Sequence, residues 1–158
     1  KSRGISSFNI VNKNKADPME EWVDSIRQVY PEADICAHYS LKYNKVPRKG
    51  VDEQKGRLLH VLEHSSANEI LIVSGSGNKT AWNTLSALQA LNQAKAFPRP
   101  TMTIAVAFNP YFPTAEQQEE ENCRLEEKLA SGCVSKVYLQ FGSNLDSLKN
   151  GLEFCQSM

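Results

Sequence analysis

The chain has 158 residues, and its 18 Lys and Arg residues balance 18 Asp and Glu residues, so its formal net charge at pH 7 is zero. A neutral chain gives no reason to expect nucleic acid or an anionic membrane surface as the main partner. No apolar run approaches the roughly 20 residues of a membrane span. A hydrophobic content of 41% suffices for the core of one domain, which we expect to comprise residues 1–158.

The predicted strands and helices alternate along the whole chain. Strands are recognised as runs of apolar and β-branched residues, and helices by apolar residues at a period of 3.6. In chain order we expect a strand at 5–11, a helix at 18–30, a strand at 35–39, a loop at 40–50, a helix at 51–65, a strand at 70–73, a helix at 80–95, a strand at 101–108, a helix at 114–131, a strand at 136–141 and a helix at 145–154.

Two helix starts carry clear capping signals. Asp17 can accept from the helix backbone, Pro18 suits the first helical position, and Glu20 would complete a capping box. Thr114 can cap the long acidic helix, which Gly132 would terminate. We also expect three large aromatic side chains in the core, namely Trp22, Trp82 and Phe154.

The stretch from Ile70 to Gly77 has the most distinctive pattern. Four consecutive branched apolar residues, Ile70 to Val73, predict a strand buried on both faces, as in a parallel sheet. Gly75 and Gly77 permit a tight turn after it, and Thr80 can cap the next helix. Ligands of α/β proteins bind at the carboxyl ends of such strands, so we expect a site at this turn.

The four cysteines are widely separated and lack CxxC spacing. This pattern favours free thiols in a reducing intracellular compartment, the cytoplasm or an organelle matrix, over a disulfide or a zinc site. We therefore predict no metal site. The cysteines are Cys36, Cys123, Cys133 and Cys155.

Five alternating βα units predict an α/β fold with a parallel sheet. They could form a flavodoxin-like doubly wound sheet, or they could be part of a TIM (β/α)8 barrel, which has eight strands and typically about 250 residues. The spacing of the units does not choose between these two architectures.

Four strand-end segments resemble methylenetetrahydrofolate reductases and occur in the same order as in that family. The resemblance covers roughly residues 30 to 150, and the family has a flavin-binding TIM barrel. It implies that this chain is part of a (β/α)8 barrel, with the rest of the chain or a protein partner covering the open sheet edges. The segments are 37–40, 72–76, 105–113 and the stretch 124–132 with 137–140.

The resemblance also implies a function and a set of binding residues. FAD would pass hydride from NAD(P)H to a folate methylene group, and Gln140 would help bind folate and nicotinamide. No catalytic residue is assigned. The residues at flavin-contacting positions are His38, Gly75, Ser76, Ala115, Glu121 and Lys128.

Several family positions differ here. Ser74 and Ser76 replace the arginine and the aspartate of the family's turn, and Phe108 and Phe112 replace a tyrosine and a histidine. The general-acid glutamate of the family's first strand has no counterpart. Neutral serines and apolar rings favour a chain without bound FAD. The alternative function is a degenerate barrel that serves as a structural or interaction subunit.

The proposed site residues also have simpler interpretations. His38 could be a strand-end histidine that is hydrogen-bonded to the backbone. The run Glu119 to Glu121 could be a solvated helix face. Lys128 lies seven residues after Glu121, two helical turns, so the two share a face. Gln140 has the strongest claim to function, because a polar amide ending an apolar strand must find partners.

Overall fold

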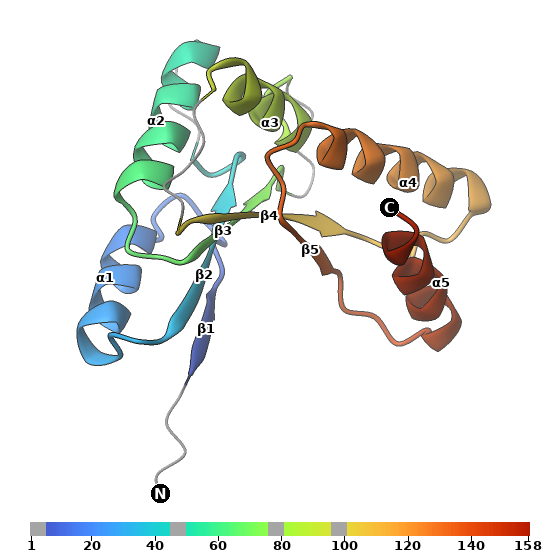
Figure 1. The fold of residues 1–158 in the computed structure, drawn as a ribbon, viewed down its shortest axis with the longest axis horizontal. Coiled ribbons are helices and arrows are strands. Elements are labelled where there is room, and N and C mark those ends of the chain that lie inside the picture. Colours follow the sequence, from blue (N-terminus) through green and yellow to red (C-terminus); the bar gives the residue numbers. More distant parts are fainter. Residues whose placement is uncertain (1–5, 45–49, 76–80, 96–100) are drawn as a thin grey trace, which may run out of the picture.

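The computed structural model describes residues 6–44, 50–75, 81–95 and 101–158. Five strands and five helices alternate along the described chain, as the sequence predicts (Figure 1). They are β1 (Ser7–Ile10), α1 (Met19–Val29), β2 (Asp34–Ser40), α2 (Val51–His64), β3 (Glu69–Val73), α3 (Thr84–Gln93), β4 (Thr103–Phe108), α4 (Ala115–Ala130), β5 (Lys136–Leu139) and α5 (Leu145–Gln156).

The five strands form one parallel sheet in the order β1-β2-β3-β4-β5. A flavodoxin-like sheet reverses its strand order in the middle, whereas the sequential order here adds every new strand to the same edge. The sheet curls, and the helices follow one another around its outer side (Figure 1). The chain is therefore a curled half-barrel of βα units, and the flavodoxin-like alternative is wrong.

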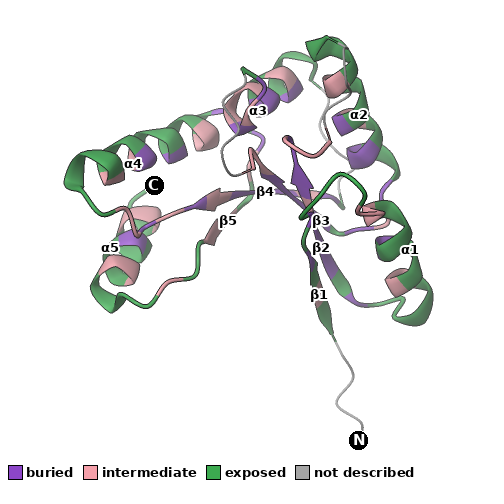
Figure 2. Ribbon diagram, turned by 180° about the vertical axis from the view of Figure 1, so that it is seen from behind, coloured by how far each residue is buried: buried purple, intermediate pink, exposed green. Residues whose placement is uncertain are grey.

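The two faces of the sheet differ in chemistry. Alternate strand residues pack under the helices in the main core, which includes Ile35, Ile70, Ile104 and Val106. The opposite, inner face carries a small apolar cluster around Leu71. Burial is concentrated on the central strands and on the helix surfaces that face them (Figure 2).

The capping predictions are confirmed at one helix and wrong at two others. Thr114 accepts from the backbone N–H of Gln117, as predicted. Asp17 instead accepts from the backbone N–H groups of Lys13 and Asn14, upstream of α1, because the loop before the helix folds around its carboxylate. α3 begins at Thr84, later than predicted, and residue 80 lies outside the described residues.

The aromatic predictions hold for Trp82, which is buried, and for Phe154, which packs against the core. Trp22 is 42% exposed, so the prediction that it lies in the core is wrong. Its helix packs beside β1 and β2 near the edge of the sheet. Helical periodicity identified the apolar stripe of α1 but could not say how much of it a neighbouring element covers.

Two further results concern the helices and the cysteines. None of the helices that the structure describes is long and apolar enough to cross a membrane. All four cysteines are free thiols, of which Cys36 and Cys133 are buried.

Candidate functional site

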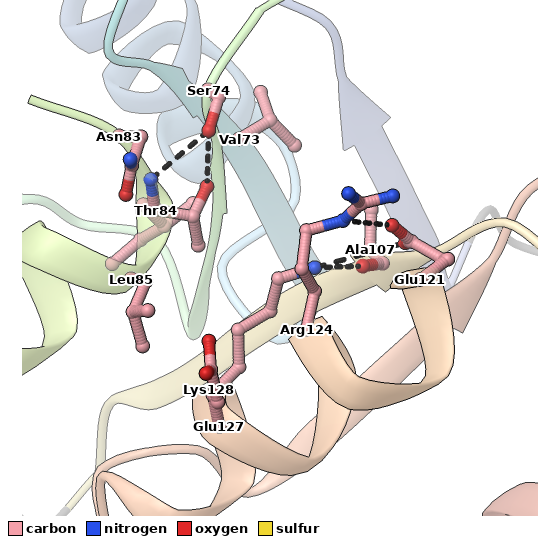
Figure 3. Close-up of a pocket in the computed structure, with 11 residues that line it drawn as sticks. Val73, Ser74, Asn83, Thr84, Leu85, Ala107, Glu121, Arg124, Glu127 and Lys128 are labelled. Atoms are coloured by element: carbon pink, nitrogen blue, oxygen red, sulfur yellow. Dashed lines mark hydrogen bonds and ion pairs between the residues drawn. The ribbon is translucent and has the colours of Figure 1, made fainter. Parts of the chain in front are cut away.

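A pocket of about 470 Å³ lies between α3 and α4, beside the carboxyl ends of β3 and β4. One side is formed by Ser74 and the start of α3 at Thr84. Polar side chains of α4 form the other side, and Figure 3 shows Glu121, Arg124 and Lys128 projecting from that helix. The pocket therefore joins the turn after β3 to the polar face of α4.

Glu121 is the most connected side chain of this pocket. Its carboxylate accepts from Nε of Arg124 at 2.9 Å and from the backbone N–H of Asn109 at 3.4 Å. The ammonium group of Lys128 lies 3.8 Å away. The residue is only 8% exposed, so the interpretation of the 119–121 run as a solvated face is wrong for Glu121.

Lys128 is partly buried on the same side of the pocket, with a side chain that is 13% exposed. Its Nζ donates to the carbonyl oxygen of Ala107 at 3.1 Å. The pairing of β3 with β4 ends at Ile72 and Val106, so the Lys128 ammonium group binds a strand carbonyl just beyond the shared ladder. Burial lowers the pKa of Lys128, while the charge of Glu121 acts in the opposite direction. The predicted common face of Glu121 and Lys128 is confirmed.

The turn after β3 holds the start of α3. The hydroxyl oxygen of Ser74 accepts from the backbone N–H of Thr84 at 3.0 Å and lies 3.0 Å from the Thr84 hydroxyl. Asn83 and Ser86 form the capping box of the helix. One turn therefore fixes both the strand end and the helix start, and the N-terminus of α3 lies at the pocket with its Thr84 and Ser86 N–H groups already bonded to Ser74 and Asn83.

Gly75 lies on the β2 side of the same turn. Its φ is +86°, a conformation that favours glycine. A Cβ atom there would lie 2.7 Å from Cβ of Lys42 and 2.9 Å from the hydroxyl oxygen of Ser40. The predicted need for glycine in this turn is confirmed, and Gly77 lies outside the described residues.

His38 lies on the inner face of β2, two residues before Ser40. Its Nε2 lies 2.7 Å from the side-chain oxygen of Asn9 on β1. The simpler interpretation of a hydrogen-bonded histidine thus holds, although the partner is a side chain and not the backbone. Burial lowers the pKa of His38, with a smaller opposing effect of Glu69, so the neutral imidazole is favoured.

Of the predicted site residues that the structure describes, only Glu121 and Lys128 line the pocket, and His38, Gly75, Ala115 and Gln140 do not. Ala115 is exposed at the first position of α4, and Ser76 lies outside the described residues. Gln140 is exposed and follows the end of β5, where its backbone N–H donates to the carbonyl oxygen of Phe108 at 2.8 Å. The argument that its amide must find protein partners therefore fails, because water can solvate it.

The two phenylalanines do not obstruct the pocket. Phe108 is 1% exposed and packs toward the helices, with its ring 5.8 Å from that of Phe154, so the expectation that it lines the flavin side is wrong. The ring of Phe112 lies 5.9 Å from the Arg124 guanidinium group. Neither ring is among the residues that line the pocket.

Sequence reasoning missed Arg124, Asn83 and Thr84. Arg124 could have been found, because it lies three residues after Glu121 and four before Lys128, on the same helical face. Among the described residues, no group of three or more His, Cys, Asp or Glu side chains is arranged to hold a metal ion.

The fold and the pocket define the chain as an α/β protein with a curled parallel half-barrel and a polar pocket at the carboxyl edge of its sheet. Comparison with known proteins found no matching family model and no matching curated protein.

Proposed function

We propose that the chain is a methylenetetrahydrofolate-reductase-like protein and that its carboxyl-edge pocket holds part of an FAD molecule. The main support is that the pocket brings together Glu121 and Lys128, which the resemblance implies as flavin contacts, with the turn that contains Ser74. A volume of about 470 Å³ falls within the range of ligand sites.

The residues of the pocket fit a cofactor that contains a diphosphate. Arg124 and Lys128 provide two cations, and the start of α3 contributes the positive end of a helix dipole. Glu121 orients both cations, and with Glu127 the pocket has two carboxylates against these two cations. Because Phe108 faces the core, one reason to expect a chain without FAD is removed.

Bound FAD would supply the passage of hydride from NAD(P)H to a folate methylene group. His38 would present a neutral imidazole toward the inner face of the sheet. Gln140, exposed after β5, would be free to bind folate or nicotinamide. We assign no general acid to the chain.

Titration of FAD with the chain tests this proposal. Binding should quench flavin fluorescence, and Lys128→Met should weaken binding at least tenfold, since one cation of the pocket is lost. Lys149→Met, which changes an exposed lysine of α5, is the matched control. Circular dichroism should first establish that both variants are folded. A chain that neither quenches FAD nor retains yellow colour after desalting would contradict the proposal.

A second candidate function, an interaction subunit, is favoured by apolar side chains near the edge strands. Phe141 is 95% exposed after β5, and Leu145 and Leu152 of α5 are 78% and 45% exposed. Near the other edge, Trp22 and Val29 are exposed on the same face of α1, two helical turns apart. Further βα units, from a longer chain or a partner, would cover these groups and pair the edges of β1 and β5.

Sedimentation velocity tests this alternative. The isolated chain should associate as its concentration rises, and the double change Phe141→Ser and Leu145→Ser should keep it monomeric without altering its secondary structure. A wild-type chain that stays monomeric at high concentration would argue against the interaction subunit.

A further inference from the structure

A hollow of about 200 Å³ lies between α1 and α2, which are neighbours on the outer side of the sheet (Figure 1). The helix α1 contributes Glu20 and Asp24 to its lining. The helix α2 contributes His60 and His64. No described residue lines both this helix-pair hollow and the carboxyl-edge pocket, so the two are separate places in the fold.

His60 and His64 are four residues apart and therefore lie on the same face of α2. Their imidazole rings stack, with centroids 4.3 Å apart and planes inclined by 26°. Pairs of histidines with this spacing on one helical face bind zinc in proteins. Each coordinating nitrogen lies about 2.0–2.1 Å from a zinc ion, so two of them are at most about 4.2 Å apart. Because both side chains are exposed and their rings already lie together, small rotations suffice to aim one nitrogen of each ring at a common ion.

The hydrogen bonding of His64 selects the nitrogen that would face an ion. Its Nδ1 lies 3.0 Å from the carbonyl oxygen of His60, and since a carbonyl oxygen only accepts, we assign the proton of the neutral ring to Nδ1. Nε2 then has the free lone pair. Metal-binding histidines donate their other N–H to a backbone carbonyl or a carboxylate in this way, which fixes the tautomer and the orientation of the ring.

The other side of the hollow supplies negative charge. Glu20 and Asp24 line it, and no lysine or arginine of the described chain does. The Ser66 hydroxyl donates to Oδ1 of Asp24 at 2.7 Å, which holds that carboxylate at the hollow. Two carboxylates beside two imidazoles favour a divalent cation. Because no group of three or more His, Cys, Asp or Glu side chains in the described chain is arranged to hold a metal ion, the carboxylates would act through water molecules bound to that cation.

We propose that the helix-pair hollow binds a divalent transition-metal ion of the zinc class through His60 and Nε2 of His64. Glu20 and Asp24 accept hydrogen bonds from the water molecules that complete its coordination. Imidazole nitrogen suits zinc, copper and nickel, whereas magnesium prefers oxygen ligands. The spacing of the cysteines gave no reason to expect a metal site, but it does not bear on this histidine pair. The bound ion cross-links the last turn of α2, and this role does not depend on FAD.

Calorimetric titration of zinc chloride and magnesium chloride into the untagged 158-residue chain tests the proposal. Zinc should bind and magnesium should not. His60→Gln and His64→Gln should each weaken zinc binding by about tenfold or more, and Asp24→Asn by about threefold, the size of one exposed charge interaction. Zinc should also raise the midpoint of thermal unfolding of the wild type but not of the double histidine variant, because a ligand of the folded chain stabilises it.

His38→Gln and Cys123→Ser are the matched controls, and both should keep wild-type zinc binding. His38 is the third histidine of the chain, and Cys123 is an exposed thiol that zinc could also bind. His60, His64 and Asp24 are exposed, so their variants should fold like the wild type. Equal binding of zinc and magnesium, undiminished zinc binding by either histidine variant, loss of binding in Cys123→Ser, or no measurable binding of zinc at millimolar concentration would overturn the proposal.

Discussion

The ammonium group of Lys128 on α4 donates a hydrogen bond of 3.1 Å to the carbonyl oxygen of Ala107 on β4. The bond lies just beyond the last pair of the β3–β4 ladder, Ile72 and Val106. The same ammonium group lies 3.8 Å from the buried Glu121 carboxylate. One side chain therefore ties the helix to the strand end and balances a buried charge at the carboxyl-edge pocket.

We predict that Lys128→Met lowers the free energy of unfolding by about 1–3 kcal/mol, because the partly buried carbonyl of Ala107 loses its donor and the buried Glu121 loses a cation. Urea denaturation measures the change. The exposed Lys149→Met variant should stay within about 0.5 kcal/mol of the wild type. Equal stabilities of the two variants would mean that the contact of Lys128 with Ala107 contributes nothing.

We predict that Gly75→Ala lowers the free energy of unfolding by about 1–3 kcal/mol, since a Cβ atom at φ +86° is strained and overlaps Lys42 and Ser40. Gly132→Ala is the matched control, because Gly132 has φ +71° but no neighbouring atom within 4 Å of the position that a Cβ atom would take. Gly132→Ala should cost only the strain, so it should be the more stable variant in chemical denaturation. The reverse order would contradict the close approach of Gly75 to β2.

The order of strands and helices was predictable because it depends on local patterns. The apolar run Ile70 to Val73 identifies a strand buried on both faces, and α/β alternation identifies a parallel sheet. The seven-residue spacing of Glu121 and Lys128 likewise fixes a common helical face. Each of these inferences needs only residues that are close in sequence.

What sequence reasoning missed depends on contacts between distant residues. Glu69 precedes an apolar run without a visible partner, and Lys136, which binds it, lies 67 residues later. The side on which Phe108 packs was available from strand alternation, because Ile104, Val106 and Phe108 share one face of β4, and only its contact with Phe154 of α5 joins distant residues. Asp17 has the sequence signature of a cap, but nearer N–H groups of its own loop bind it.

The pKa of Glu69 predicts how stability depends on pH. Its pKa in the folded chain lies below its ordinary value of 4.5. The unfolded chain therefore binds more protons in this range, and the stabilisation from Glu69 is present above pH 4.5 and lost as the pH falls through the folded pKa. Glu69→Gln should show a smaller loss of stability than the wild type between about pH 5 and 3.

Urea denaturation at a series of pH values measures this difference. Glu153→Gln, an exposed change on α5, serves as the control and should follow the wild-type curve. Parallel curves for Glu69→Gln and the wild type would show that the ion pair of Glu69 with Lys136 does not stabilise the fold.

The docking of α5 gives the last prediction. A Cβ atom on Gly151 would lie 2.5 Å from Cβ of Pro110 and 3.4 Å from the ring of Phe108, and the proline ring cannot rotate away. Gly151→Ala should therefore lower the free energy of unfolding by about 1–2 kcal/mol despite the better helix propensity of alanine. Hydrogen exchange should be faster in α5 than in the wild type.

Gly56→Ala makes the same chemical change within α2, where no neighbouring atom lies within 4 Å of the new Cβ position. This variant should be more stable than the wild type by about 1 kcal/mol, because only the helix propensity changes. Opposite signs for the two substitutions, measured by urea denaturation, are the expected result. If Gly151→Ala also stabilised the chain, α5 would not be held against Pro110 and Phe108 as closely as the structure has it, and the apolar side chains Leu145 and Leu152 would no longer have a fixed position beside the edge of β5.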